Sequence, residues 1–475
     1  MNHKLLKRIF LTFSFVLALG ASAAHAVISA AERQVLLDIY TNTNGAGWTT
    51  STNWNGVVGT ECTWSGVTCD GLGNTVVIIG LGNNNLNGTL PSNLNNLSNL
   101  TRIYVDYNPL LTGSIPPLAG LTSLISVDAY NSNFSGTIPS LAGLTNLVSF
   151  EVDNNQLTGP IPSLAGLTNL TVFNAYNNQL TGSIPSLTGL INLERFRVYD
   201  NQLTGSIPVL TGLINLEWFE VQLNQLTGPI PSLAGLTNLE LFSAHGNQLT
   251  GWMPVLTGLT NLTHFYASSN QLIGSIPVLT GLSNLEIFSV DNNQLTGPIP
   301  VLAGLTNLMN FDAFNNQLTG FIPSLAGLTN LERFRVDTNQ LTGPIPSLTG
   351  LSNLYSFYVN SNQLTGSIPS LAGLNSLMFF HVENNQLSGN VPAVPSPTNL
   401  LMAGGSGLCP NYLNPTPNTD WNTATSSSPW YALCTAAPAG PSSLTPIPTL
   451  SAWGLILLSI LLAGAALLGL RRQGL

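Results

Sequence analysis

The chain has 475 residues, of which 44% are hydrophobic and only 7% are charged, and it contains 45 glycines and 30 prolines. Residues 27–445 contain six arginines, no lysine and twenty acidic side chains, a balance that argues against binding of nucleic-acid phosphates. Hydrophobic residues at this density, placed periodically, also argue against disorder and favour a repetitive solenoid.

The N-terminal segment has the features of an export signal. Lys4, Lys7 and Arg8 precede an apolar run at residues 9–21, and the small residues Ala24 and Ala26 follow it. This order predicts a secretory signal peptide at residues 1–26, with a buried first helix as the alternative.

Residues 27–75 are expected to form a cap. Trp48, Trp54 and the segment Trp64–Cys69, which has the pattern W-x-G-V-x-C, resemble the cap that precedes plant-type leucine-rich repeats. Two cysteines lie near each end of the repeat region, so the local pairs Cys62–Cys69 and Cys409–Cys434 are predicted among three possible pairings. The alternative, a zinc site, requires tighter clustering with histidine.

Residues 76–394 repeat a 23-residue unit about fourteen times. One unit has Leu147, Phe150, Val152, Asn155 and Leu157 in the pattern L-x-x-L-x-L-x-x-N-x-L, and Leu157 is also the first residue of the following L-T-G-x-I-P segment. This pattern resembles the plant-type leucine-rich repeat of receptor ectodomains and polygalacturonase inhibitors. The resemblance implies a right-handed horseshoe solenoid, conventionally in the α/β class, with a parallel sheet on its concave side.

The repeated residues have structural tasks. A single unit cannot bury its apolar face, so the units must stack. The central strand position is phenylalanine from Phe150 through Phe380, eleven units in succession, which predicts a continuous aromatic core. Thirteen of the fourteen units have asparagine at the position of Asn155, and Ser132 is the exception. We expect these amides to bond the backbone of neighbouring turns.

The variable residues are expected on the concave face, because strand side chains alternate between the two faces of a sheet. Arginines, carboxylates and large aromatic residues gather at these positions, a composition that is typical of binding surfaces. Plain solvation of the sheet would explain the carboxylates but not the aromatic rings. The predicted ligand-binding residues are Tyr104, Tyr130, Glu151, Asp153, Tyr176, Arg195, Arg197, Tyr199, Trp218, Glu220, Tyr266, Asp312, Arg333, Arg335 and Tyr358.

Three details of this face are predicted. Tyr176, Tyr199, Trp218 and Tyr266 are expected to form the central cluster. Arg197 should lie beside Glu220, and Asp312 beside Arg335, because each pair shares one column in adjacent units. The recurrence of the arginine pair of residues 195 and 197 six units later is explained by duplication within the gene.

The C-terminal region is expected to contain a cap at residues 395–435, a linker at 436–445 and a sorting motif with a transmembrane helix at 446–475. Residues 453–470 lack charge and precede Arg471 and Arg472, about the length that crosses a bilayer. The motif residues Ile447, Pro448, Thr449, Leu450 and Trp453 resemble the IPTL-CTERM sorting signal of Gram-negative bacteria. The resemblance implies an exosortase-like processing enzyme, an inner-membrane intermediate and delivery to the cell surface or envelope. A plain C-terminal anchor is the alternative.

The sequence therefore predicts an envelope-anchored protein that binds an extracellular protein or polysaccharide, with no cofactor or metal. A structural role in an exopolysaccharide matrix is the alternative. An enzyme is disfavoured: Glu151 and Asp153 have a spacing near that of a glycosidase pair, but a shallow open sheet is expected to supply neither a raised pKa nor a cleft.

Overall fold

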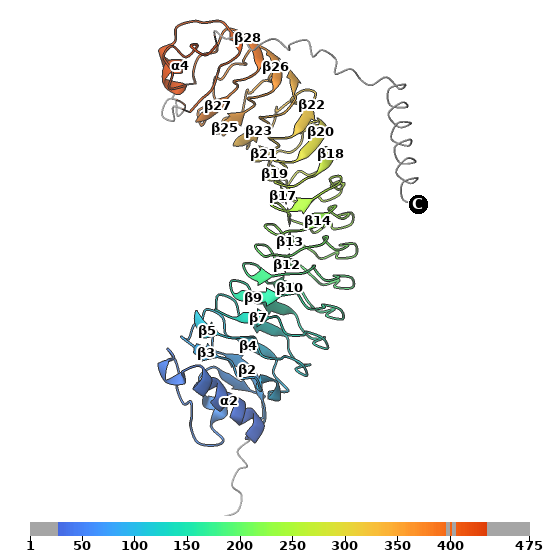
Figure 1. The fold of residues 1–475 in the computed structure, drawn as a ribbon, viewed down its shortest axis with the longest axis vertical. Coiled ribbons are helices and arrows are strands. Elements are labelled where there is room, and N and C mark those ends of the chain that lie inside the picture. Colours follow the sequence, from blue (N-terminus) through green and yellow to red (C-terminus); the bar gives the residue numbers. More distant parts are fainter. Residues whose placement is uncertain (1–26, 396–399, 401–404, 435–475) are drawn as a thin grey trace, which may run out of the picture.

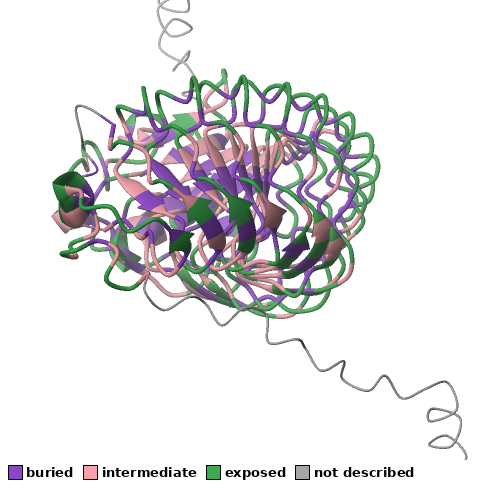
Figure 2. Cartoon of the chain, turned by 90° about the horizontal axis from the view of Figure 1, so that it is seen from above, coloured by how far each residue is buried: buried purple, intermediate pink, exposed green. Residues whose placement is uncertain are grey.

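The computed structural model describes residues 27–395, 400 and 405–434, which form one elongated, curved solenoid with a cap at each end (Figure 1). Each turn contributes one short strand to a continuous sheet on the inner side. Buried residues concentrate on these strands, and the outer turns form the rim of the molecule (Figure 2). The stacked turns therefore share one hydrophobic core.

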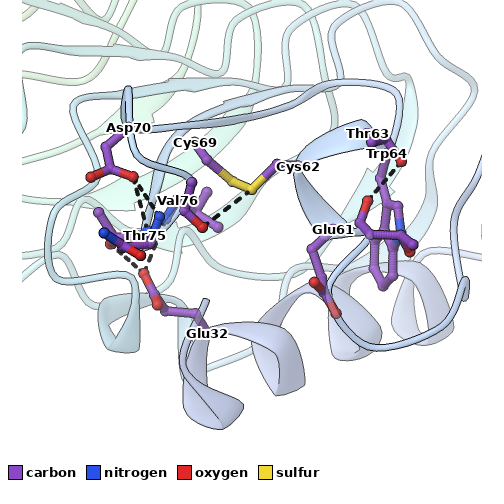
Figure 3. Close-up of a disulfide and its surroundings, with 12 residues drawn as sticks. Glu32, Glu61, Cys62, Thr63, Trp64, Cys69, Asp70, Thr75 and Val76 are labelled. Atoms are coloured by element: carbon purple, nitrogen blue, oxygen red, sulfur yellow. Dashed lines mark hydrogen bonds between the residues drawn. A yellow bond between two sulfur atoms is a disulfide. The ribbon is translucent and has the colours of Figure 1, made fainter. Parts of the chain in front are cut away.

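The N-terminal cap is a helix joined to the first strands through a buried carboxylate. Helix α2 (Ala30–Asn42) begins with a capping box between Ser29 and Glu32, which satisfies backbone donors of its first turn. Glu32 also accepts hydrogen bonds from the Thr75 hydroxyl and from the Val76 amide, which starts the sheet (Figure 3). The Cys62–Cys69 disulfide closes the adjoining loop. Short 3-10 turns occupy Gly45–Gly47, Glu61–Thr63 and Leu94–Asn96.

The principal sheet has fifteen strands. Its first strand, β1 (Val67–Cys69), pairs antiparallel with β2 (Val76–Gly80), and every later strand pairs in parallel. The remaining strands, in order along the sheet, are β4 (Arg102–Tyr104), β6 (Ser126–Asp128), β8 (Ser149–Glu151), β10 (Val172–Asn174), β12 (Arg195–Arg197), β13 (Trp218–Glu220), β15 (Leu241–Ser243), β17 (His264–Tyr266), β19 (Ile287–Ser289), β21 (Asn310–Asp312), β23 (Arg333–Arg335), β25 (Ser356–Tyr358) and β27 (Phe379–His381).

Short strands on the outer side were not predicted. The Gln-Leu-Thr-Gly segments and their equivalents pair with one another in small parallel sheets of two to four strands. These strands are β3 (Asn87–Thr89), β5 (Leu110–Thr112), β7 (Ser135–Thr137), β9 (Gln156–Gly159), β11 (Gln179–Leu180), β14 (Thr227–Gly228), β16 (Gln248–Leu249), β18 (Ile273–Ser275), β20 (Gln294–Pro298), β22 (Gln317–Thr319), β24 (Thr342–Gly343), β26 (Gln363–Gly366) and β28 (Gln386–Gly389).

The predicted phenylalanine core is confirmed. Rings of successive turns stack from Phe150 to Phe380 at centroid distances such as 5.7 Å between Phe150 and Phe173, with planes 16° apart. All eleven rings are fully buried. The Trp421 ring of the C-terminal cap packs against Phe380, with ring centroids 6.2 Å apart, and so covers the end of the stack.

The asparagines that recur once per turn tie each turn to the one before it, as predicted. The Asn178 amide nitrogen donates to the carbonyls of Val152, Ala175 and Tyr176, and its oxygen accepts from the Leu157 amide. The same set recurs through the repeat, whereas the Ser132 hydroxyl forms longer contacts of 3.2 to 3.4 Å. Four backbone groups per turn therefore depend on one side chain.

The residue before each buried asparagine has a left-handed backbone. Asparagine is common at this position, as at Asn315 with φ 51°, and glycine occupies it once, at Gly246. Thr338 adopts the same conformation with φ 56°. A β-branched residue is strained there, so this position is constrained although the repeat consensus leaves it variable.

The C-terminal cap begins as a further, degenerate turn that the sequence analysis missed. Asn411 is fully buried and accepts from the Leu387 amide while donating to the carbonyls of Val382 and Leu408. Strand β29 (Tyr412–Leu413) then pairs with β28, and α4 (Thr419–Ala424) covers the core end. The Cys409–Cys434 disulfide is present, so both predicted pairings are confirmed.

The predicted repeat solenoid of about fourteen turns with disulfide-bonded caps is confirmed. Within residues 27–395, 400 and 405–434, no helix is both long and apolar enough to span a bilayer. The predicted signal peptide and transmembrane helix both lie outside the described residues. The domain boundaries remain predictions.

The asparagine network yields a stability prediction. Asn224→Ala should lower the free energy of unfolding by at least about 2 kcal/mol, because it leaves buried backbone groups without their hydrogen-bond partner. Asn238→Ala is the matched control: that exposed amide donates only to the Ile214 carbonyl, so the loss should stay below about 1 kcal/mol. Urea denaturation of both variants measures the difference, and equal losses would refute the assigned role.

The position with a left-handed backbone, one residue before the recurring asparagine, allows a stabilising substitution. Thr338→Asn should raise the free energy of unfolding by about 1 kcal/mol, because asparagine tolerates this conformation better. Its side-chain amide would also continue the row in which Asn315 Nδ2 donates to the side-chain oxygen Oδ1 of Asn292, 2.8 Å away. The reverse change, Asn315→Thr, should destabilise by a similar amount in calorimetry. A destabilising Thr338→Asn would contradict the argument.

Candidate functional site: the concave sheet

The concave surface consists of three columns of side chains, defined by their position relative to the buried central residue of each strand. The first column precedes that residue, the second follows it, and the third lies two positions further along. On β12 these are Arg195, Arg197 and Tyr199, around the buried Phe196. Strand pairing is in exact register, with Arg195 beside Trp218 and Arg197 beside Glu220.

All fifteen predicted ligand-binding residues lie in these columns. The first column contains Arg195, Trp218 and Arg333; the second contains Tyr104, Glu151, Arg197, Glu220, Tyr266, Asp312, Arg335 and Tyr358; the third contains Tyr130, Asp153, Tyr176 and Tyr199. Their role in binding remains a prediction.

The first cluster is organised by Arg197. Its guanidinium carbon lies 4.9 Å from the ring centroid of Tyr176, 5.7 Å from that of Tyr199 and 5.5 Å from that of Trp218. The two tyrosine rings stack at 4.4 Å with planes 6° apart. Such cation–π contacts each contribute about 0.5–2 kcal/mol, so the side chains hold one another in place before any ligand arrives.

Tyr266 does not join this cluster, contrary to the prediction. It lies between two histidines, with its centroid 6.0 Å from that of His245 and 5.9 Å from that of His264. The reason is distance: Tyr266 lies in the same second column as Arg197, but three strands further along the sheet. At about 4.8 Å per strand it is out of reach of that guanidinium.

A second cluster repeats the arrangement six turns further on. The Arg335 guanidinium lies 4.0 Å from the Phe314 centroid and 4.8 Å from that of Tyr358. His381 stacks on Tyr358 at 4.4 Å with planes 10° apart. The sequence analysis did not assign His381 to a site, although its position beside Tyr358 in the second column was a usable signal.

The arginines are paired with carboxylates, but not always with the predicted partner. Arg197 Nε lies 2.5 Å from Glu220 Oε2, as predicted. Asp312 instead pairs with Arg333, at 2.9 Å, although Arg335 is its neighbour in the column, and Arg335 turns to Asp337. The predicted position of Asp312 beside Arg335 is therefore confirmed, but its close ion pair is formed with Arg333 of the first column.

These ion pairs leave donor groups available. Arg197, Arg333 and Arg335 each use only Nε for the close contact, and their terminal nitrogens have no other protein partner in the described part of the chain. A guanidinium presents five N–H donors in a fixed plane. The clusters can therefore donate hydrogen bonds to carbonyl or hydroxyl oxygens of a ligand.

The N-terminal end of the concave face is acidic and partly desolvated. Burial raises the pKa of Asp128 to about 6; the Ser126 hydrogen bond opposes the shift, whereas the nearby charges of Glu151 and Asp106 add to it. Burial also raises the pKa of Asp153, although a hydrogen bond from Tyr176 opposes that shift. The expectation that an open sheet supplies no raised carboxyl pKa was wrong, because these carboxylates are partly desolvated by burial.

Comparison with known proteins gives a consistent picture. Residues 445–472 match the IPTL-CTERM motif. Among curated proteins, the receptor-like kinase TMK2 of Arabidopsis thaliana is 44% identical over 78 residues, which are 16% of this chain and 8% of the kinase. The chain thus spans only a small part of that relative's length.

Among solved structures, the Arabidopsis receptor kinase HAESA, in complex with the peptide hormone IDA and the co-receptor SERK1, aligns with a TM-score of 0.65. The alignment has 28% identity and covers 81% of this chain and 66% of that one. The plant peptide hormone receptor RGFR1, in complex with RGF2, aligns with a TM-score of 0.62 and 30% identity, over 75% and 66% of the two chains.

The functional domain of InlJ from Listeria monocytogenes shares the fold, at 16% identity and a TM-score of 0.53. The solenoid fits a leucine-rich-repeat protein whose structural neighbours are plant-type receptor ectodomains, and the chain has an IPTL-CTERM motif near its C-terminus.

Proposed function

We propose that this chain is an exported, envelope-anchored recognition or adhesion protein whose concave sheet binds an extended extracellular ligand. The observation that carries the proposal is the pair of arginine–aromatic clusters on that sheet. The rings of these clusters are half-buried, and aromatic and arginine side chains of this kind dominate binding energy at protein interfaces. Their mutual contacts reduce the side-chain entropy lost on binding.

A peptide or protein segment is the favoured ligand. The free guanidinium nitrogens of Arg197 and Arg335 can donate to main-chain carbonyls, and the two clusters lie about 29 Å apart at the usual strand spacing. An extended segment of about nine residues covers this distance. The solved complexes of HAESA and RGFR1 with peptide hormones support this choice, and a polysaccharide is the other possible ligand.

A structural role in an extracellular matrix is the second candidate. It is favoured by large apolar side chains exposed on the outer turns, among them Trp252, Val255 and Phe321, which are 65–70% exposed. Exposed apolar surface of this kind is common at sites of association. Under this alternative the concave clusters would be dispensable.

The concave proposal is tested by substituting its rings. Trp218→Ala and Tyr199→Ala should each weaken binding of the intact, detergent-solubilised chain to its best peptide on an array by about tenfold or more, because each removes a packed aromatic contact. Trp252→Ala is the matched control, since it removes an exposed tryptophan from the outer side. Loss of binding in the control alone, or unchanged binding in both concave variants, would favour the matrix role.

The proposed anchoring is tested separately. Deletion of residues 446–475 should release the protein from cells into the medium, because it removes the motif and the predicted membrane helix. Immunoblots of cell and medium fractions measure the distribution. A control deletion of residues 436–445, the predicted linker, should leave the protein with the cells. Retention of the tail-deleted chain would contradict the anchoring proposal.

A further inference from the structure

A groove runs along the flank of the solenoid, beside the concave sheet and distinct from its three columns. We call it the flank groove. Two stretches of it are hollows, of about 490 Å³ between Ser123 and Asn215 and about 280 Å³ between Glu286 and Asn353. Both stretches are lined by the same two positions of the repeat. The groove is therefore a product of the 23-residue period.

One wall of the groove is a ladder of asparagines. In the first stretch it consists of Asn146, Asn169, Asn192 and Asn215. Each amide nitrogen donates to the main-chain carbonyl 24 residues earlier, at 2.9 Å in all four cases. Because only the amide nitrogen can donate to a carbonyl, this bond fixes the orientation of the amide. The side-chain oxygen Oδ1 is therefore the terminal atom that does not take part in the bond. These four oxygens have no protein donor within the described residues, so each can accept a hydrogen bond.

The floor of the groove changes from apolar to acidic. Ile125 and Val148 are half-buried and present hydrocarbon, Thr171 follows, and Glu194 ends the first stretch. In the second stretch the floor consists of Glu286, Met309 and Glu332. The described residues that line the two stretches include no lysine or arginine. The groove therefore offers apolar surface and hydrogen-bond acceptors, and it repels anions.

We propose that the flank groove binds a neutral, extended polysaccharide. A sugar ring has hydroxyl donors around its edge and an apolar C–H face, which matches amide oxygens above a floor of Ile125 and Val148. Successive rungs are about 4.8 Å apart at the strand spacing, close to the length that one sugar residue adds to an extended glycan. Hydroxyl groups would donate to the Asn146 and Asn169 oxygens, and C–H faces would pack on Val148.

The uniformity of the wall favours a polysaccharide over a peptide. Four of the five wall positions in the first stretch are asparagine, with Ser123 as the exception at its first turn, and the second stretch has asparagine at residues 307, 330 and 353. Identical rungs cannot distinguish one side chain from another, but they match a polymer of identical units in any register. The concave clusters, in contrast, differ from turn to turn and present arginine donors. This proposal rests on other residues than the concave site and does not require that site to function.

The test uses the intact chain in detergent and affinity electrophoresis through gels that contain dextran, β-1,3-glucan, hydroxyethylcellulose or, as the anionic comparison, alginate. We expect retardation by at least one neutral polymer and none by alginate. The double variant Val148→Trp/Met309→Trp fills both stretches and should weaken retardation at least tenfold. Raising the salt concentration should change it little, because no ion pair contributes.

Two further variants keep the test decisive. Asn169→Leu/Asn330→Leu removes two wall amides at nearly constant side-chain volume and should weaken retardation severalfold, even if the tryptophan variant fails to fold. Trp218→Ala should leave retardation unchanged while weakening peptide binding, which separates this site from the concave one. Retardation by none of the neutral polymers, retardation by alginate alone, or full retardation of the asparagine variant would overturn the proposal. So would a peptide whose binding depends on Val148.

Discussion

The asparagine that recurs in nearly every turn is the constraint on which the rest of this structure depends. Its single amide satisfies backbone groups of two consecutive turns, as Asn178 does for Val152 and Leu157. An unsatisfied buried carbonyl or amide is costly, so a turn cannot slip along its neighbour without losing several bonds. This fixed register aligns equivalent positions of every turn, and the aligned positions make the phenylalanine core, the concave columns and the flank groove.

Much of the fold could be predicted because it depends on the period. The 23-residue spacing determines which residues stack, so the core from Phe150 to Phe380 and the asparagine column followed directly from the sequence. The left-handed position occupied by Thr338 could not be predicted, because its φ follows from the tight turn at the end of the strand. The extra turn at Asn411 was missed because Cys409 and Pro410 hide its L-x-x-N-x-L spacing.

The candidate site was only partly predictable. Alternation along the strands places residues on the concave face, but the choice among neighbours depends on side-chain length and direction. Arg333 reaches across to Asp312, and Arg335 turns along its own strand to Asp337. The raised pKa of Asp128 likewise depends on what covers the carboxylate. The wall and floor of the flank groove are two residues apart in each unit, as Asn146 and Val148 are, but the groove itself forms only where successive turns stack.

The register of the strands makes the concave face a preorganised surface. A crystal structure at side-chain resolution tests this most directly. The Arg197 guanidinium is expected over the rings of Tyr176 and Tyr199, with Trp218 beside it on the same open face. Rings directed into the core, or a shift of one residue between β12 and β13 that separates Arg197 from Glu220, would contradict it.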